Sequence, residues 1–398
     1  MLNSDIPSAP RNKVFQRLIS IHKTVAFVIL NTLILFGLFN IAFYIIYSMV
    51  DWKKAENPFA AHPEEWQDAA YPGWKPEDRS VLYNESYGHE LVFDDYVMFK
   101  NGPLQGRYVN ISDVGFRVSK NQGPWPPDPN NYTVFVFGGS TMLGSGVTDE
   151  ETVSSGLQDA LSRHIDKRVC VYNFGTSFYY STQERILLER LLSKGYTPDA
   201  AIFVDGLNDF IQSEDTSAHR QKFKDAFEIE KGNKELLAAM FTKLPIWRPV
   251  NSIQARLQPP AIPDATDHAD KATQTIGTYL SNKSLIESVC KAKGVTPIFV
   301  WQPVPIYNYD LEYFPWYKQF SMHQLHPVGY PMMRELVDNG GLGENFLWCA
   351  DLQQDEKECL YVDFHHYTAS FSMKLADTIC QMAMERELLM PDQAQPQK

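Results

Sequence analysis

The feature that most constrains the fold of this chain is an uninterrupted apolar run near the N-terminus. Residues 24–50 read TVAFVILNTLILFGLFNIAFYIIYSMV and contain no Asp, Glu, Lys, Arg or His. A helix needs about 20 apolar residues to cross the hydrocarbon core of a bilayer, so the run predicts a transmembrane helix over 24–50. A cleaved signal peptide is the alternative. Its apolar region would span about 7–15 residues and end at a small-x-small cleavage site, which the following SMVDWKK does not offer.

The charges on either side of this run predict its orientation. Four basic residues precede it between Arg11 and Lys23, whereas only Lys53 and Lys54 follow closely, next to acidic residues. Basic flanks favour the cytoplasmic side of a membrane. We therefore expect a single-pass membrane protein, with a cytoplasmic tail over 1–23 and the larger part of the chain extracytoplasmic, in the periplasm or outside the cell.

The remaining composition is that of a globular protein with an acidic balance. Of 398 residues, 44% are hydrophobic and 21% are charged, and the formal net charge is -12. No Lys/Arg block interrupts the C-terminal two thirds of the chain. Because phosphate binding needs a concentrated basic surface, we expect no nucleic-acid partner.

The five cysteines divide into two kinds. Cys170 and Cys380 lie in apolar patterns and are expected to be small buried hydrophobes. Cys349 and Cys359 bracket the polar loop ADLQQDEKE. If the domain is extracytoplasmic, a disulfide between them is plausible, and we hypothesise one.

Beyond the apolar run, the chain changes character at about residue 131. Residues 51–130 are rich in Pro, Trp, Tyr and Asn and predict an extended extracytoplasmic collar or linker. In the domain over 131–390, short β-branched and aromatic runs alternate with helical segments. The predicted strands cover 133–137, 168–174, 200–206 and 295–303, and the predicted helices 149–161, 182–195 and 272–294.

This alternation predicts the fold class. Strands that alternate with helices form a central, mostly parallel sheet between two helical layers, which is an α/β/α three-layer sandwich. Two insertions, 212–271 and 303–346, interrupt the rhythm and are expected to lie over the edge of the sheet where loops carry function. The second holds seven aromatic residues between Tyr307 and Phe320. We favour a packing role for them over a stacking surface for sugar rings or acyl chains.

Three predicted strands end in residues that could stabilise a negative charge. Ser140 follows the glycines of VFVFGGS, although an ordinary turn would use the same residue types. Gly175 and Asn208 follow the next two strands, and Asn208 with Asp209 could instead cap a helix. Parallel strands end at one edge, so the N–H groups of Ser140 and Gly175 and the amide of Asn208 would meet as an oxyanion hole.

The sequence YVDFHHYTAS near the C-terminus supplies a candidate base. Asp363 and His366 are three residues apart, so one turn can carry both and let the carboxylate orient the imidazole towards Ser140. His365 is the rival base. His323 and His326 have a spacing that could bind a metal, but no Cys or acidic partner lies in register, so we expect no metal site.

These blocks, in this order, resemble the SGNH (GDSL-type) hydrolase superfamily over residues 132–385. The resemblance implies a flavodoxin-like sandwich, with Ser140 as nucleophile, Gly175 and Asn208 in the oxyanion hole, and Asp363 and His366 as orienter and base. It implies no cofactor. The first block is Gly-Gly-Ser here, where the family commonly has Gly-Asp-Ser. We expect the substrate-binding site to be lined by Gly139, Asp209, Gln302 and Trp316.

The resemblance leaves three functions open. The first is a membrane-anchored serine esterase that removes an acyl group, most simply acetyl, from a cell-envelope or exported glycan. The second is an O-acyltransferase that uses the same acyl-enzyme. The third is a non-catalytic scaffold subunit of an envelope assembly. A non-catalytic member would be expected to have lost a catalytic residue, and this sequence has all of them.

Overall fold

The computed structural model describes residues 11–56, 64–211, 244–250, 253, 265–315 and 323–389. The chain forms two compact units, one of residues 1–56 with 222–261 and one of residues 57–221 with 262–398. Trp316 and most of the 212–271 insertion lie outside the described residues.

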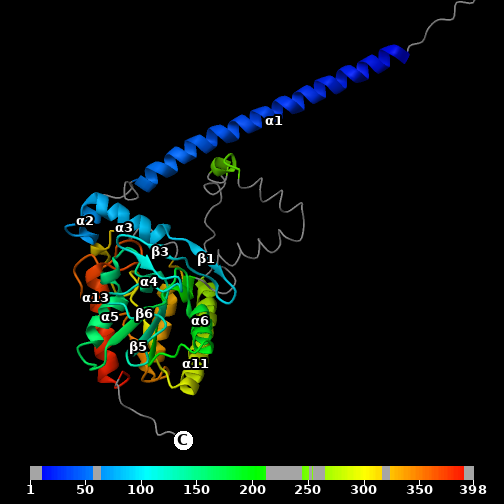
Figure 1. The fold of residues 1–398 in the computed structure, drawn as a ribbon. Coiled ribbons are helices and arrows are strands. Elements are labelled where there is room, and N and C mark those ends of the chain that lie inside the picture. The colour runs from blue at the N-terminus through cyan, green and yellow to red at the C-terminus, as the bar shows by residue number, and fades with distance from the viewer. Residues whose placement is uncertain are drawn as a thin grey trace, which may run out of the picture. The chain divides into compact units, whose positions relative to one another are not determined.

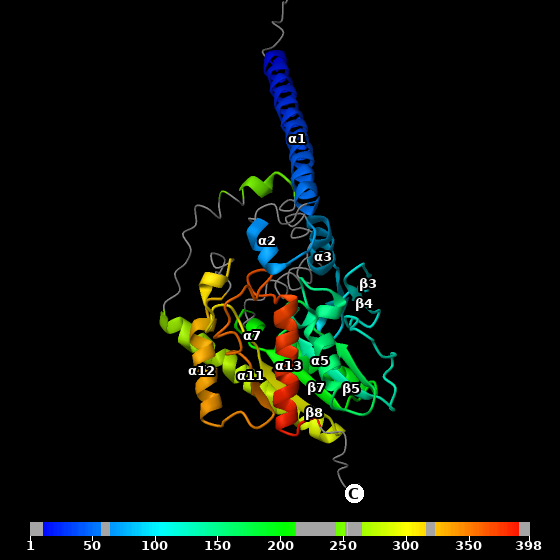
Figure 2. The ribbon, with the colours of Figure 1, turned by 90° about the vertical axis from the view of Figure 1, so that its left-hand side faces the viewer.

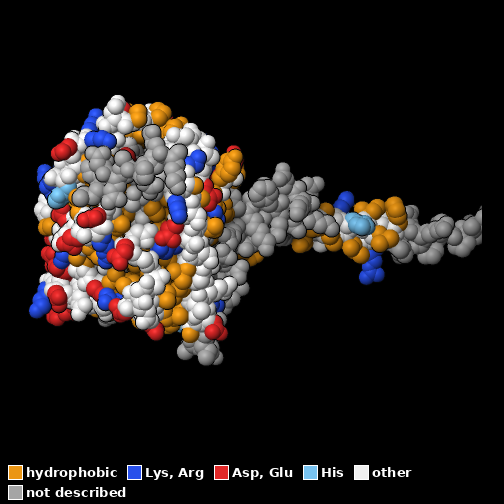
Figure 3. All heavy atoms as spheres, turned by 90° about the horizontal axis from the view of Figure 1, so that it is seen from below, with side chains coloured by type: hydrophobic (Ala, Val, Ile, Leu, Met, Phe, Trp, Pro, Cys, Tyr) orange, Lys and Arg blue, Asp and Glu red, His pale blue; other side chains and the backbone are white. Residues whose placement is uncertain are grey.

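The smaller unit contains the long helix α1, Arg11–Glu56. Within its stretch Phe15–Val50, the most apolar window has a mean hydropathy of 2.3 and no buried residue. Phe27 and Leu33, for example, are 67% and 62% exposed, and Figure 3 shows hydrophobic side chains on the surface of the helix, together with basic ones and a histidine. The helix is therefore long and apolar enough to span a membrane.

The larger unit is built on a five-stranded sheet in the order β6-β5-β7-β8-β9. All four neighbouring pairs are parallel. Its strands are β5 (Tyr132–Gly138), β6 (Val169–Asn173), β7 (Ala200–Asp205), β8 (Thr296–Trp301) and β9 (Phe346–Trp348). The four predicted strands are confirmed, and β9 is an additional short strand at the edge.

The side chains of these strands are buried on both faces and alternate between two hydrophobic clusters. In β5, Val134 and Val136 contribute to one cluster, and Phe135 and Phe137 to the other. Such continuously apolar strands belong in a sheet that helices cover on both sides. The α/β/α sandwich predicted from the sequence is thus confirmed.

Each face of the sheet has its own helices, as Figures 1 and 2 show. One cluster contains residues of α5 and α13 and the other residues of α6, α11 and α12. The helices are α4 (Ser140–Leu143), α5 (Val153–Leu161), α6 (Ser181–Ser193), α7 (Leu207–Ile211), α11 (Ala265–Lys293), α12 (His326–Asp338) and α13 (Ala369–Glu385), with 3-10 turns η1 (Asp149–Glu151) and η2 (Leu311–Tyr313).

The segment that precedes the sheet differs from the extended collar that we expected. Residues 57–130 belong to the same compact unit as the sheet. This N-terminal segment forms α2 (Glu64–Ala70), α3 (Pro76–Gly88) and the strand pairs β1 (Leu91–Asp94) with β2 (Met98–Asn101) and β3 (Leu104–Gln105) with β4 (Asn110–Ile111). Its buried residues, such as Leu82 and Ile111, form a third cluster that includes Val362, next to the predicted base-bearing loop.

The expectation for the insertion 303–346 is corrected. Its described part belongs largely to the sandwich, because α12 lies within it and places Tyr330 and Met333 in the core. Tyr309 and Phe314 are buried, in agreement with the packing role favoured for these aromatic residues.

The disulfide hypothesis is wrong in this structure, where Cys349 and Cys359 are both free. Cys349 lies in the core after β9, whereas Cys359 packs against the cluster of the N-terminal segment and donates its S–H to the carbonyl oxygen of Tyr361. Burial raises the pKa of the Cys349 thiol to about 12 and that of Cys359 to about 11. The two thiols are therefore protonated and unreactive at neutral pH.

Candidate active site

Ser140 lies at the carboxyl end of β5, as the first residue of the short helix α4. A Cβ at position 139 would come within 2.1 Å of Nδ2 of Asn208. Glycine at this position therefore allows the Asn208 amide to lie directly against the backbone that precedes the serine. Asn208 follows β7, the neighbour of β5, so the sheet brings these two strand ends together as the sequence predicts.

A chain of two hydrogen bonds links Ser140 to Asp363 through His366. Oγ of Ser140 is 2.8 Å from Nε2 of His366, and Nδ1 of His366 is 2.6 Å from Oδ2 of Asp363. A carboxylate only accepts hydrogen bonds, so we assign the imidazole proton to Nδ1. Nε2 then accepts from the serine hydroxyl, which is the arrangement a general base requires.

Asp363 accepts hydrogen bonds at both oxygens. Oδ1 accepts the backbone N–H groups of His365 and His366, at 2.9 and 2.8 Å. Oδ2 accepts from His366 and from the hydroxyl of Tyr87, the latter at 2.8 Å. Burial alone would raise the pKa of Asp363, but the charge and hydrogen bonds of His366 outweigh it and hold that pKa below its usual value. The carboxylate is therefore charged at neutral pH.

Tyr87 comes from α3 in the N-terminal segment, 276 residues before Asp363. Its ring also packs edge-on against the imidazole of His366, with 5.6 Å between ring centroids. Burial and the neighbouring Asp363 charge raise the pKa of the Tyr87 hydroxyl well above its ordinary value. Tyr87 thus remains protonated and donates to Asp363. The sequence analysis missed this residue, because nothing in its local pattern points to a partner so far along the chain.

His365, the rival base, lies in a different environment. It belongs to a group of three buried imidazoles, which we call the histidine cluster: His323, His326 and His365. His365 is the member next to His366, with 4.2 Å between ring centroids. The ring centroid of His323 is 4.7 Å from that of His326 and 5.8 Å from that of His365. Nδ1 of His365 is buried and has no hydrogen-bond partner among the described residues.

Burial lowers the pKa of all three members of the histidine cluster. The pKa of His323 falls to about 4, and that of His326 falls to about 3 with the additional effect of His323. Burial and the proximity of His366 lower the pKa of His365 well below its ordinary value. Nε2 of His326 donates to the carbonyl oxygen of Leu207, the residue of α7 that precedes Asn208. The cluster is therefore a neutral structural support.

Two of the donors expected to form an oxyanion hole, Asn208 and Gly175, differ in their hydrogen bonds. Nδ2 of Asn208 donates one hydrogen to the carbonyl oxygen of Tyr179 at 2.7 Å, and a primary amide carries a second hydrogen. The N–H of Gly175, in contrast, donates to Oδ1 of Asn173 at 2.9 Å. A Cβ at position 175 would lie 2.3 Å from the backbone nitrogen of Leu143. Gly175 is therefore a packing residue against α4 here, and its N–H does not face an oxyanion.

The N-terminal segment also fixes the loop that carries Ser140. Arg117 is fully buried, and its guanidinium donates to the carbonyl oxygens of Leu143, Gly144 and Val147 and to Oδ1 of Asp149. These carbonyls lie at and beyond the C-terminal end of α4, where backbone acceptors lack helical partners. Arg117 thus closes the turn that follows the serine.

The residues expected to line the substrate are mostly engaged in the interior. Gln302 is 2% exposed, and its Oε1 accepts from Oγ1 of Thr141 and from the hydroxyl of Tyr367 at 2.7 and 2.9 Å. Asp209 is 4% exposed and accepts from the hydroxyl of Ser181 at 2.7 Å. Both residues therefore support the site rather than line it. Gly139 lies at the site, and Trp316 lies outside the described residues.

One group of residues has a spacing that could hold a metal ion. Asp363, His365 and His366 each offer a ligand atom, and the three atoms lie within 4.8 Å of one another. Asp363 and His366 already share a 2.6 Å hydrogen bond. A metal at this position would compete with that bond, so the metal arrangement predicts that a chelator changes the reactivity of the site and the hydrogen-bonded arrangement predicts that it does not.

Comparison with known proteins gives likenesses of structure only. No protein-family model matches the chain, and no curated protein is similar to it in sequence. Among 47 matching chains of known structure, an α/β hydrolase from a Lake Arreo metagenome is 12% identical, covers 65% of this chain and 96% of its own, and has a TM-score of 0.33. A lipase from a goat rumen metagenome is 11% identical, with coverages of 65% and 100% and a TM-score of 0.39. A member of the lipolytic G-D-S-L family from Veillonella parvula is 10% identical, with coverages of 64% and 96% and a TM-score of 0.34.

Proposed function

We propose that this protein is a serine esterase of the SGNH type, anchored to a membrane by α1. The observation that carries the proposal is the continuous hydrogen-bond chain from Oγ of Ser140 through His366 to Asp363, at 2.8 and 2.6 Å. A serine hydroxyl is a weak nucleophile until a base accepts its proton. Ser140 has such a base, and the base has a charged and fully hydrogen-bonded orienter.

The proposed reaction proceeds through an acyl-enzyme. Oγ of Ser140 attacks the ester carbonyl while Nε2 of His366 takes the hydroxyl proton. The oxyanion that forms accepts hydrogen bonds from the N–H of Ser140 and the second N–H of the Asn208 amide. The intermediate collapses and the alcohol leaves with the proton from His366. Water, activated by the same imidazole, then attacks the acyl-enzyme and releases the acid and free Ser140.

In this mechanism, Tyr87 is a positioning residue. The hydroxyl donates to the oxygen of Asp363 that also accepts from Nδ1 of His366. It therefore limits rotation of the carboxylate and stabilises its charge, which in turn stabilises the imidazolium that forms during each proton transfer. The N-terminal segment thus completes the site.

The substrate that we propose is an O-acetylated glycan of the cell envelope. Basic residues precede the apolar run 24–50 within α1, which by the positive-inside rule favours an extracytoplasmic catalytic unit, where such glycans occur. Hydrolysis of acetylated oligosaccharides by the detergent-solubilised chain would support this assignment. Cleavage of lipid esters without any release of acetate from acetylated sugars would contradict it.

The test of the esterase proposal is labelling of the full-length chain in detergent with a fluorophosphonate, followed by mapping of the adduct by mass spectrometry. We expect one adduct, on Ser140, at the same rate with and without EDTA. No adduct on a folded, monodisperse protein would refute the activated serine. Labelling that EDTA changes would favour the metal arrangement of Asp363, His365 and His366.

Transfer of the acyl group to an added glycan faster than to water would identify an acyltransferase.

A further inference from the structure

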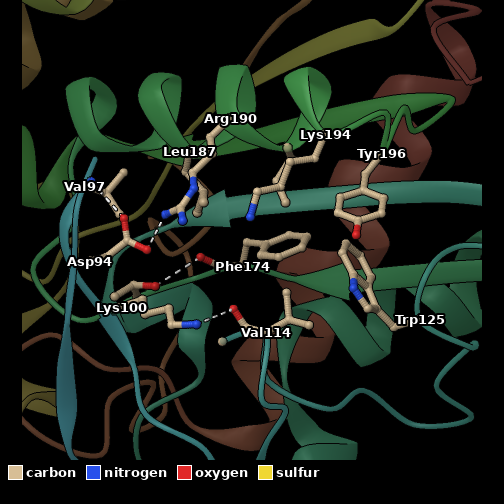
Figure 4. Close-up of a pocket in the computed structure, with 13 residues that line it drawn as sticks. Asp94, Val97, Lys100, Val114, Trp125, Phe174, Leu187, Arg190, Lys194 and Tyr196 are labelled. Atoms are coloured by element: carbon tan, nitrogen blue, oxygen red, sulfur yellow. Dashed lines mark hydrogen bonds and ion pairs between the residues drawn. The ribbon is translucent and has the colours of Figure 1, made fainter.

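A pocket lies on the α6 face of the larger unit, apart from the candidate active site. Its volume is about 210 Å³, and its lining comes from α6, the β1-β2 pair, the segment around Val114 and Trp125, and the loop after β6. Figure 4 shows its side chains converging from these elements. Ser140, Asp363 and His366 are not among its lining residues. The pocket is therefore a separate place on the molecule.

One wall of this pocket is positively charged. Lys100, Arg190 and Lys194 line it together with a single acid, Asp94. Asp94 is already ion-paired with Arg190 and accepts the backbone N–H groups of Tyr96 and Val97 as well. The negative charge of Asp94 is thus compensated, and the pocket retains the charges of two lysines.

The two lysines have no acidic partner among the described residues that line the pocket. Nζ of Lys100 donates only to the neutral carbonyl oxygens of Asp113 and Val114, at 3.2 and 3.4 Å. Lys194 follows α6 directly, and its ammonium group points towards Phe174 in Figure 4. Nε of Arg190 is buried without a hydrogen-bond partner among the described residues. In a chain with a net charge of -12, this local excess of positive charge favours an anion.

The opposite wall is apolar and aromatic. The ring of Trp125 packs against Tyr196 with 4.7 Å between centroids and against Phe174 with 5.8 Å. Leu187 and Leu191 of α6 add further apolar lining to the pocket. The rings are held by their mutual contacts, so the surface exists before any ligand arrives. It can cover a ring or a short acyl chain.

We propose that this pocket binds a small organic anion, a carboxylate or a phosphate ester with a ring or short acyl body. The anionic group would lie near Lys100 and Lys194, and the apolar body against Trp125, Phe174 and Tyr196. The volume of about 210 Å³ is below the roughly 300–1,000 Å³ of pockets that take drug-sized molecules. The ligand is therefore a small one, and its binding is independent of the esterase chemistry.

The test is titration calorimetry of the full-length chain in detergent with four probes: benzoate, phenyl phosphate, neutral benzamide and inorganic phosphate. We expect benzoate or phenyl phosphate to bind at least about tenfold more tightly than either benzamide or inorganic phosphate. Tighter binding of benzoate indicates a carboxylate ligand, and tighter binding of phenyl phosphate a phosphate ester. Equal affinity for benzoate and benzamide, or no binding of any probe, overturns the proposal.

Matched variants locate the binding. Lys100→Met and Lys194→Met should each weaken the preferred anion by about fivefold, while Lys291→Met, an exposed lysine of α11, should not. Ser140→Ala should leave binding unchanged, and loss of binding in that variant would place the ligand in the active site instead. The wild-type affinity should also fall as salt screens the charges, which requires no variant. Affinity insensitive to salt and to both lysine substitutions would refute the site.

Discussion

His366 and the histidine cluster are neighbours in the same buried region, yet their surroundings differ in one decisive respect. His366 lies between a hydroxyl donor and a carboxylate, at 2.8 and 2.6 Å. His323 and His326 are also buried, and burial outweighs every other influence on them and lowers their pKa to about 4 and about 3. A buried imidazole accepts a proton readily only where a charged partner offsets the cost of burying the resulting cation.

The largest expected effect comes from removing the nucleophile. Ser140→Ala should abolish the fluorophosphonate adduct and lower kcat/KM for an ester by about 10⁴-fold or more, because it removes the hydroxyl on which the proposed acyl-enzyme forms. His366→Ala should behave similarly. Ser288→Ala, an exposed serine of α11, should retain normal labelling and serves as the control. Persistent labelling at Ser140 in His366→Ala would show that another group acts as the base.

Loss of the charge beside His366 should have the next largest effect. Asp363→Asn replaces the acceptor of the Nδ1 proton with a neutral amide and should slow labelling by about 10³-fold or more, as the corresponding change does in Ser-His-Asp proteases. Thermal unfolding would verify that the variant is folded. An Asp363→Asn variant within tenfold of wild type would mean that the carboxylate contributes little, and that His366 resembles the histidine cluster after all.

The histidine cluster should make the protein sensitive to acid. Burial depresses the pKa of His326 from its usual 6.5 to about 3, so below pH 6.5 the unfolded chain binds a proton that the folded chain does not. Stability contributed at neutral pH is therefore lost as pH falls, by about 2 kcal/mol for this residue at pH 5. Thermal unfolding at pH 7 and pH 5 measures the loss. His326→Gln should reduce it, whereas exposed His164→Gln should not. Identical pH dependence in all three proteins would contradict the assignment.

The hydroxyl of Tyr87 should make a smaller contribution to labelling. Tyr87→Phe removes one of four donors to Asp363 and should slow labelling about tenfold, because a hydrogen bond to a charged group contributes about 1.5–3 kcal/mol and the other three remain. A purely structural role would lower the unfolding temperature without a change in labelling rate at a temperature where the variant is folded. Tyr96→Phe, which removes an exposed hydroxyl, is the control.

The smallest effect is expected at His365, the neighbour of His366. His365→Gln should label within about threefold of wild type, because its ring takes no part in the Ser140 to Asp363 chain and the substitution keeps the backbone N–H that donates to Asp363. The measurement is the same labelling rate, at one pH. A loss comparable to that of His366→Ala would make His365 the base and overturn the comparison.

The candidate site shows where local patterns suffice for prediction and where they fail. The strand ends that carry Ser140 and Asn208, and the turn that carries Asp363 and His366, were predicted because each lies beside a strong strand or helix signal. The oxyanion role of Gly175 was not upheld, because its N–H donates a hydrogen bond to the side chain of Asn173, two residues earlier in the chain. The Cys349–Cys359 hypothesis failed since loop spacing does not tell which cluster each thiol joins.

The sequence by itself determined the apolar helix, the parallel sheet between two helical layers and the grouping of candidate residues at one sheet edge. These features depend on runs of apolar residues and on neighbours a few positions apart. The tertiary structure alone decided that Tyr87 reaches Asp363 across 276 positions and that Arg117 closes the turn after Ser140. It also decided which of the buried histidines has a carboxylate. Such contacts depend on how distant segments pack, and no periodicity in the chain encodes them.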